Sequence, residues 1–137
     1  GFGIGDQNTI AALRRYQSRG GLNIMAIAAA VASLQDPDRL ENERARNTAA
    51  REATVSFFQD AGYELTDSQA NFLFVKLGIP AKEFRDACAA KGVVVGRDFP
   101  PYEKTHCRIS IGTMAEMQRA FEVFSEVLDI PSTKRSA

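Results

Sequence analysis

The sequence has little of what metal sites, disulfide frameworks and nucleic-acid-binding surfaces are built from. It contains one histidine and two cysteines, and its 17 Lys and Arg residues are balanced by 17 Asp and Glu residues. A single histidine and two separated cysteines provide no metal-ligand spacing and no disulfide framework. A net charge of zero argues against a nucleic acid or an anionic membrane surface as a partner. We therefore expect no metal, no nucleic acid and a cytoplasmic location.

The sequence also lacks a hydrophobic run long enough to cross a membrane. Its most apolar stretch, residues 22–32, follows a basic segment and resembles a secretion signal. That stretch is far shorter than the roughly 18 to 20 residues that a membrane-spanning helix needs. Its apolar character comes mostly from alanine, which predicts a helix from Asn23 to about Gln35 that is buried on more than one side.

Motifs for nucleophilic catalysis and nucleotide binding are missing as well. The glycines at positions 1, 3 and 5 do not have the spacing of a dinucleotide-binding loop. We expect His106 to be an ordinary histidine at the end of a loop. Cys88 lies on the apolar side of a predicted helix, so we expect it to pack rather than to act as a nucleophile. No catalytic residue can be assigned to this chain from its motifs.

The pattern of apolar residues predicts an α+β fold in which helices pack on one face of a small sheet. From residue 39 onward the predicted order is α-β-α-β-β-α. The chain opens with Phe2 and Ile4 alternating between glycines, as if part of a strand whose partners belong to other sequence. The expected elements are a strand at 1–5, helices at 6–21, 23–35 and 36–62, a strand at 70–77, a helix at 80–92, strands at 93–96 and 107–111, and a helix after 113.

Two helix starts can be predicted from capping residues. Asp36 followed by Pro37 is typical of an N-cap and a first helical position, which starts the long helix there. That helix is highly charged in its first half, which is typical of a connector between two bodies. Thr113 and Glu116 have the spacing of a capping box at the start of the last helix.

Arg108 stands in the middle of an otherwise apolar strand, and Arg97 follows the predicted strand before it. Both could lie at one edge of the small sheet. Arginine presents a planar fork of donors that matches a carboxylate or a phosphate. An arginine on a covered face would need such an anionic partner, because an unpaired buried charge is costly. An arginine on a solvated face would need none, and both alternatives are open.

Five segments, in this order, resemble class I/II pyridoxal-phosphate-dependent aminotransferases of fold type I, and the histidinol-phosphate aminotransferase branch best. They are GFGIG, LNIMAIAAAVASLQD, SQANFLFVKL, GVVVGRDFPPY and CRISIGTMAEM. The resemblance extends from residue 1 to about Leu128, and RISIGT-x-x-EM and S-x-A-N-F are its more specific parts. It implies that the chain is the C-terminal portion of such an enzyme.

The resemblance also implies a domain organisation and a set of partners. Residues 1–35 would be the tail of the large α/β cofactor-binding domain. Residues 36–131 would form the long connecting helix and the small C-terminal domain, and residues 132–137 a frayed tail. The complete enzyme would be a homodimer that uses pyridoxal 5'-phosphate to move an amino group between a small anionic amino donor and a 2-oxo acid.

The resemblance assigns substrate-binding roles to three residues. In the family, the strand arginine that matches Arg108 binds the acidic group of the substrate, which is a carboxylate or a phosphate. Arg97 lies in a VGR-x-FPP segment that resembles one sub-branch, so its assignment is less specific. Asn23 alone represents the family's N-V-N turn, because Leu22 occupies the position of the first asparagine.

The family's cofactor-binding lysine would lie just upstream of the position that matches Gly1. No lysine of this chain stands in a matching segment, so we expect no cofactor-binding residue here and an inactive chain when it is alone. Two alternatives to an enzyme fragment are open. One is a non-catalytic α+β module that binds a small anionic metabolite, and the other is a structural domain in which Arg108 pairs with Glu or Asp.

Overall fold

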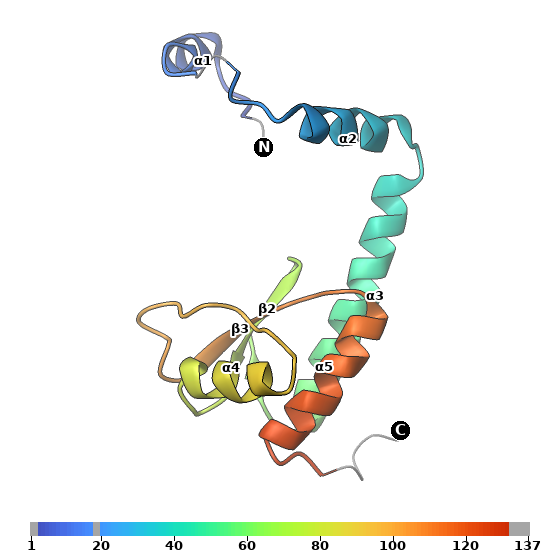
Figure 1. The fold of residues 1–137 in the computed structure, drawn as a ribbon, viewed down its shortest axis with the longest axis vertical. Coiled ribbons are helices and arrows are strands. Elements are labelled where there is room, and N and C mark those ends of the chain that lie inside the picture. The colour runs from blue at the N-terminus through green and yellow to red at the C-terminus, as the bar shows by residue number, and fades with distance from the viewer. Residues whose placement is uncertain (1–2, 18–19, 132–137) are drawn as a thin grey trace. The chain divides into compact units, whose positions relative to one another are not determined.

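The computed structural model describes residues 3–17 and 20–131 (Figure 1). The chain divides into two compact units, Gly1–Arg39 and Leu40–Ala137. The assignment of residues 1–35 to a cofactor-binding domain and of residues 36–131 to a connecting helix and small domain stays a prediction. The tail predicted at 132–137 lies outside the described residues.

The first unit contains two helices, each started by a polar side chain. Helix α1 (Gln7–Arg14) begins where the Asp6 carboxylate accepts hydrogen bonds from the backbone N–H groups of Asn8 and Thr9 at 3.0 and 3.1 Å. Helix α2 (Ile24–Gln35) starts one residue after the predicted start, Asn23, and ends at the predicted residue. Helix α1 ends earlier than the predicted glycine pair, because turns follow Arg14. None of the helices among the described residues combines the length and apolarity needed to cross a membrane.

Two expectations for the first unit are wrong. Residues 3–5 form no strand, since no neighbouring strand of this unit is available to bond their backbone groups, and residues 1–2 lie outside the described residues. Helix α2 is not buried, because the first unit has no second layer to cover its apolar side chains. Ile24 is 77% exposed, Leu34 is 86% exposed and Ile4 is 91% exposed.

The long helix α3 (Arg39–Asp60) leads into the second unit and starts two residues after Pro37, the predicted first helical position. Asp36 instead follows the end of α2, and its carboxylate accepts a hydrogen bond from the N–H of Asp38 at 3.2 Å. This local turn keeps residues 36–38 out of the helix. The helix ends near the predicted glycine, where Gly62 takes a φ of +88°, a value that glycine adopts easily.

The sheet of the second unit has three antiparallel strands in the order β1-β2-β3. Strand β1 (Glu64–Leu65) is short, whereas β2 (Phe72–Lys76) and β3 (His106–Ser110) pair along their full length. The register places Phe74 directly opposite Arg108. Side chains on each strand alternate between the two faces of the sheet.

The observed order from α3 onward is α-β-β-α-β-α, which corrects the predicted order in two places. The strand predicted at 93–96 is absent, because this segment makes a single backbone bond to β3, from Gly96 N–H to the Arg108 carbonyl at 3.1 Å. The short run Glu64–Leu65 was not predicted as a strand. It is paired to β2, and its Glu64 carboxylate lies 2.8 Å from the Lys76 ammonium.

The core lies between one face of this sheet and three helices, α3, α4 (Ala81–Ala90) and α5 (Met114–Val127). Figure 1 shows α5 beside α3, and the stacked rings of Phe57 and Phe121 join them with centroids 4.6 Å apart. The predicted capping box of α5 is confirmed, as is the packing of α3 near Phe58. The fully buried larger side chains of this core include Phe58, Leu73, Val75, Phe84, Ile109 and Phe124.

Candidate functional site

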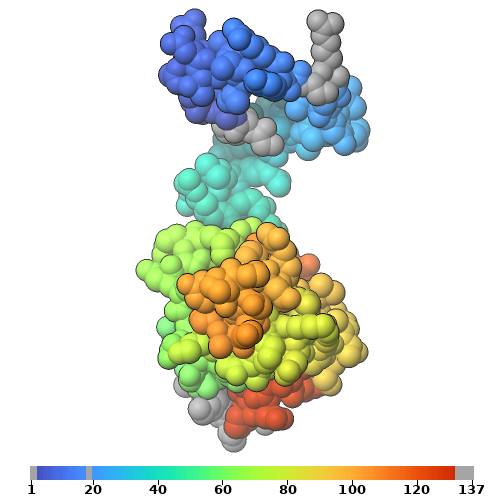
Figure 2. Space-filling view, turned by 90° about the vertical axis from the view of Figure 1, so that its left-hand side faces the viewer, coloured from blue at the N-terminus to red at the C-terminus, as the bar shows by residue number. Residues whose placement is uncertain are grey.

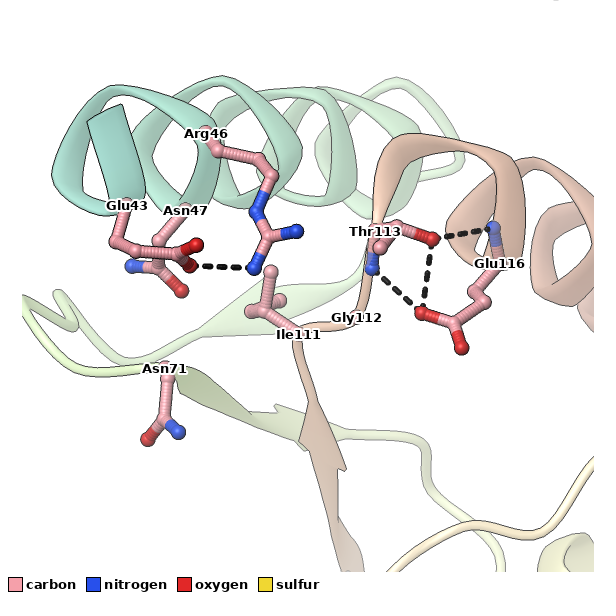
Figure 3. Close-up of a pocket in the computed structure, with 8 residues that line it drawn as sticks. All are labelled: Glu43, Arg46, Asn47, Asn71, Ile111, Gly112, Thr113 and Glu116. Carbon is pink, nitrogen blue, oxygen red and sulfur yellow. Dashed lines mark hydrogen bonds and ion pairs between the residues drawn. The ribbon is translucent and has the colours of Figure 1, made fainter. Parts of the chain in front are cut away.

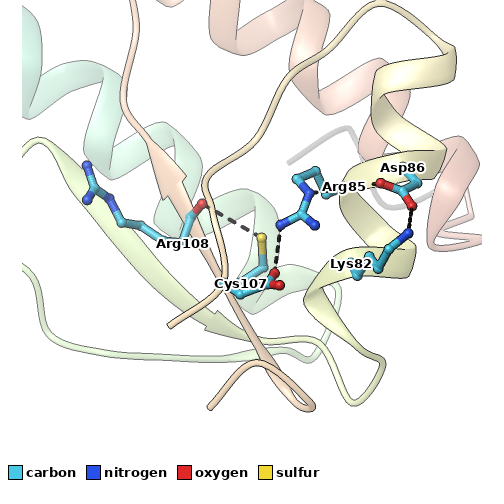
Figure 4. A network of polar contacts seen from close by, with 6 residues as sticks. Lys82, Arg85, Asp86, Cys107 and Arg108 are labelled. Atoms are coloured by element: carbon cyan, nitrogen blue, oxygen red, sulfur yellow. Dashed lines mark hydrogen bonds and ion pairs between the residues drawn. The ribbon is translucent and has the colours of Figure 1, made fainter. Parts of the chain in front are cut away.

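Arg108 lies on the face of the sheet that is turned away from the helical core. Its neighbours on β3, Cys107 and Ile109, are 1% and 2% exposed and belong to the core. Figure 4 shows the side chain of Arg108 extending to the opposite side of the strand from the Cys107 thiol. The alternation predicted from the sequence is therefore confirmed, and Arg108 is half-buried rather than fully solvated.

Two aromatic rings hold the guanidinium group of Arg108. Its Cζ atom lies 4.5 Å from the centroid of the Phe72 ring and 5.6 Å from that of Phe99. The Nε atom is buried and has no hydrogen-bond partner among residues 3–17 and 20–131. Within those residues no carboxylate lies at ion-pair distance from this guanidinium either. The charge of Arg108 is therefore placed on a partly covered surface without an ion-pair partner among the described residues, and a guanidinium in that state suits an anionic ligand.

Arg97 lies in the loop between α4 and β3 and is exposed. Its Cζ atom is 4.9 Å from the centroid of the same Phe99 ring that contacts Arg108. The structure thus brings the two predicted arginines to one aromatic side chain. No described carboxylate forms an ion pair with Arg97. The pair makes this surface locally cationic in a chain of zero net charge.

Asn23, the third residue predicted to bind substrate, is the N-cap of α2 in the first unit. Its side-chain oxygen accepts a hydrogen bond from the N–H of Met25 at 2.9 Å. This contact explains why the helix begins at residue 24. A role of Asn23 in substrate binding stays a prediction.

The loop that carries Arg97 and Phe99 is attached at two points that sequence reasoning missed. Asp98 faces α4, where its carboxylate oxygen Oδ1 lies 2.6 Å from Nη1 of Arg85. Gly96 packs so closely on β3 that a Cβ atom at this position would lie 2.7 Å from the Arg108 carbonyl oxygen. These contacts join residues far apart in sequence, so alternation within a single segment could not have predicted them.

A hollow of about 390 Å³ lies away from Arg108, where α3, α5 and the ends of β2 and β3 meet (Figure 3). Asn47 and Asn71 are among its lining residues, and their side-chain amides make no hydrogen bond to other described residues. Asn71 belongs to the S-x-A-N-F segment, which was the available sequence signal for this position. The hollow is lined by Glu43, Arg46, Asn47, Asn71, Ile111, Gly112, Thr113 and Glu116.

The charged groups of this hollow are already engaged with one another. Arg46 pairs with Glu43 one turn earlier on α3. Glu116 accepts hydrogen bonds from the backbone N–H and the hydroxyl of Thr113 at 2.7 and 2.8 Å, and these donors lower the pKa of Glu116 below its usual value. The hollow is therefore better suited to joining α5 to α3 and the strands than to recognising an anion.

The thiols and the histidine show no sign of catalytic activation. Burial in the core raises the pKa of Cys88 to about 12 and that of Cys107 to about 11. A raised pKa keeps a thiol protonated and unreactive, so the prediction that Cys88 packs is confirmed. His106 begins β3, with its ring stacked on Phe74 at 5.2 Å. No group of three possible metal ligands occurs in the part of the chain that the structure describes.

The described lysines do not form a site for pyridoxal phosphate. Lys76 and Lys91 each pair with a carboxylate of a neighbouring element, Lys82 pairs with Asp86 of its own helix, and Lys104 is an exposed loop residue. The buried unpartnered nitrogen in this unit belongs to Arg108, a fixed cation that cannot form a Schiff base. The described residues therefore fit an anionic ligand but not the cofactor, and no chemical step through the cofactor is derived from them.

The fold and the site define a small α+β domain. Its edge strand β3 carries, at its middle residue, an arginine that has no ion-pair partner among the described residues. The chain belongs to the aminotransferase class I and II family, whose model matches residues 1–124. This result confirms the family resemblance read from the sequence. The observed fold also agrees with the predicted α+β class, apart from the order of helices and strands along the chain that is corrected above.

Several curated relatives are similar over most of this chain. A histidinol-phosphate aminotransferase of Akkermansia muciniphila is 33% identical over 132 residues, which cover 93% of this chain and 35% of the relative. An aromatic amino acid aminotransferase of Nocardia farcinica is 33% identical over 112 residues, which cover 82% of this chain and 30% of the relative. The chain thus spans about a third of the length of the relatives it matches.

Solved structures share the fold. A candidate histidinol-phosphate aminotransferase from Erwinia carotovora atroseptica superposes with a TM-score of 0.80 at 32% identity, over 87% of this chain and 34% of that one. Histidinol-phosphate aminotransferase from Sinorhizobium meliloti, solved in complex with pyridoxal-5'-phosphate, gives a TM-score of 0.76 at 24% identity, over 89% of this chain and 34% of that one.

Proposed function

We propose that this chain is the C-terminal part of a pyridoxal-phosphate-dependent aminotransferase and that Arg108 binds the anionic group of its substrate. The reaction would transfer an amino group between an amino acid, or an amine similar to histidinol phosphate, and a 2-oxo acid. The observation that carries the proposal is the guanidinium of Arg108, which is half-buried and unpaired among the described residues. Membership of the aminotransferase family gives this group a substrate class.

Arg108 would contribute to the reaction by fixing the position of the substrate. A guanidinium fork that binds a carboxylate or a phosphate with two parallel hydrogen bonds fixes both the location and the orientation of the ligand. Such a fixed anion places the rest of the substrate at a defined distance, which lowers the entropic cost of reaction. Arg97, beside the same Phe99 ring, would strengthen the local positive potential for an approaching anion.

The other parts of the proposal rest on the family alone. Pyridoxal 5'-phosphate would supply the electron sink for transamination in the complete enzyme, and that enzyme would be a homodimer in the cytoplasm. We propose that the 137-residue chain by itself is inactive, because three of its described lysines are paired with carboxylates and the fourth, Lys104, is exposed in a loop. Asn23 would belong to the part contributed by residues 1–35.

Substitution of Arg108 in a complete enzyme that contains this chain tests the proposal. Arg108→Lys keeps the charge but loses the fork, and Arg108→Ala loses both, so we expect KM for anionic substrates to rise in that order. Arg119→Ala is the matched control, because Arg119 is exposed on α5 and pairs with Glu122. Unchanged KM values in both Arg108 variants would refute the substrate-binding role.

One alternative is a non-catalytic module that binds a small anionic metabolite through Arg108. It is favoured by the same unpaired guanidinium and does not need the cofactor. The intact mass of the natural gene product separates the two possibilities. A mass two to three times 15.0 kDa supports the enzyme, whereas a product of 15.0 kDa supports the module. The structural alternative, in which Arg108 pairs with Glu or Asp, disagrees with the contacts of the described residues.

A further inference from the structure

We propose that Phe72 and Phe99 are positioning residues for Arg108, and that the ion pair between Arg85 and Asp98 keeps Phe99 in place. The inference rests on the proposed role of Arg108 as the group that binds an anion. It adds four side chains that act through Arg108 without touching the ligand. The inference is based on two observations. The faces of two aromatic rings contact the unpaired guanidinium of Arg108, and the loop that contributes one of these rings is attached to α4 by an ion pair.

An arginine that must receive an anion has to be held without using up its charge. A carboxylate would fix the guanidinium, but it would also neutralise it and occupy its N–H donors. The face of an aromatic ring attracts a cation and leaves the donors in the guanidinium plane free. The rings of Phe72 and Phe99, at 4.5 and 5.6 Å from the Arg108 Cζ atom, meet this requirement.

The two rings reach Arg108 from different parts of the second unit. Phe72 lies on β2, next to β3, so the sheet itself fixes its position. Phe99 lies in the loop between α4 and β3, and its ring meets that of Phe74 edge to face, with centroids 6.1 Å apart and planes at 88°. Phe74 is directly opposite Arg108 in the strand register. The Phe99 ring is therefore supported by the same sheet face that carries Arg108.

The backbone on either side of Phe99 is tied to two different elements. Gly96 donates a hydrogen bond to the Arg108 carbonyl at 3.1 Å, and there is no room for a side chain at this contact. Asp98 is held by Arg85 of α4, in an ion pair whose side chains are 25% and 41% exposed. Because Asp98 is turned to α4, its neighbours Arg97 and Phe99 can both lie beside the sheet.

Loss of the ion pair between Arg85 and Asp98, which we call the tether, should therefore weaken anion binding although neither residue contacts the anion. Without the ion pair, the loop would sample positions in which Phe99 no longer covers the Arg108 guanidinium. Arg108 would keep its charge but would adopt more rotamers, and the anion would have to order it on binding. The predicted effect is a weaker affinity for the anion, with the second unit still folded.

The test uses the 137-residue chain, inorganic phosphate as the probe, and two readouts. Phosphate affinity is measured by titration, and the environment of Arg108 by the NMR resonance of its Nε–H group, which ring currents of Phe72 and Phe99 displace. We expect Phe99→Leu and Phe72→Leu to weaken phosphate binding about three- to tenfold and to move this resonance. Phe99→Tyr retains the ring face and should bind as the original chain does.

The tether is tested in the same way by Arg85→Ala, which should weaken binding about two- to fivefold, and by Arg85→Lys, which should restore much of it. Arg46→Ala is the matched control, since it removes an exposed ion pair, with Glu43 of α3, that involves neither Arg85 nor the loop. If Phe99→Leu and Arg85→Ala alter neither readout while Arg108→Ala abolishes binding, the positioning role is refuted and the proposed function stands. If Arg108→Ala binds phosphate like the original chain, the anion-binding role fails too.

Discussion

The two faces of one small sheet are built for different purposes. The face toward the helices carries Leu73 and Val75 of β2 with Cys107 and Ile109 of β3, and each of these side chains is at most 2% exposed. The other face carries aromatic rings and the Arg108 guanidinium, and it is only half covered by the loop between α4 and β3. Figure 2 shows the segment around residue 100, in orange, at the surface of the second unit.

The difference shows how a five-residue strand can serve stability and recognition at once. Because successive side chains point to opposite faces, Arg108 can be left without a partner while its neighbours on both sides are packed in the core. Partial burial of the Arg108 charge costs solvation free energy, and the aromatic rings on the same face of the sheet offset part of that cost. The close packing of the other face holds the strand in register.

The largest effect is expected from truncating the core face. Leu73→Ala removes a fully buried side chain of β2 and leaves a cavity, so it should lower the free energy of unfolding by about 2–5 kcal/mol. Urea denaturation measures this change. Val94→Ala is the control, because Val94 is 86% exposed and its truncation should change stability by less than about 0.5 kcal/mol. Equal losses in the two variants would contradict the division between the faces.

A second expectation concerns the two thiols of the core. Burial raises the pKa of Cys88 to about 12 and that of Cys107 to about 11, against 9.0 for an exposed thiol. Since the folded-state pKa values are the higher ones, the stability linked to these groups is fully present below pH 9 and is lost as the pH rises through about 11 and 12. At pH 8 iodoacetamide should modify neither cysteine in the folded chain and both in urea. Rapid modification of Cys107 in the folded chain would place it outside the core.

The smallest effect is expected at the turn between β3 and α5. Thr113→Ala removes the side chain that caps α5, so it should cost about 1 kcal/mol, whereas Thr113→Ser keeps the hydroxyl and should cost little. Thermal unfolding of the two variants provides the comparison. Because the pKa of Glu116 is lowered by the Thr113 donors, the contribution of the Glu116 carboxylate to this cap should be present at neutral pH and fade as the pH falls below the usual value of 4.5. A Thr113→Ala deficit that persists unchanged at pH 3 would show that the Glu116 carboxylate contributes nothing to it.

Local signals in the sequence were sufficient for much of the fold. Alternation around Arg108 predicted which side chains of β3 face the core, and Thr113 with Glu116 predicted the start of α5. The bounds of α2 followed from its apolar run after Asn23. Each of these features depends on residues within one turn of helix or one strand, where spacing alone carries the information.

The features that were wrong or missed depend on contacts across the chain. The valine-rich segment at 93–96 resembles a strand, but it has only one backbone bond to β3. The burial predicted for α2 required a covering layer that the first unit does not contain. Phe99 and the pair Arg85–Asp98 could not be linked to Arg108 from spacing, since the fold brings them together from separate segments. Phe99 belongs to the sequence segment RDFPP, but the neighbouring residues of that segment do not indicate which side chain Phe99 contacts.

A comparison of Arg108→Ala with Ile109→Ala is the most direct test of the division between the two faces. These adjacent residues of β3 are on opposite faces, so two measurements on each variant, phosphate affinity and the free energy of unfolding, separate recognition from stability. We predict that Arg108→Ala loses phosphate binding with little change in stability, and that Ile109→Ala loses about 2–5 kcal/mol of stability. Undiminished phosphate binding by a folded Arg108→Ala variant would contradict the assignment of this face to an anionic ligand.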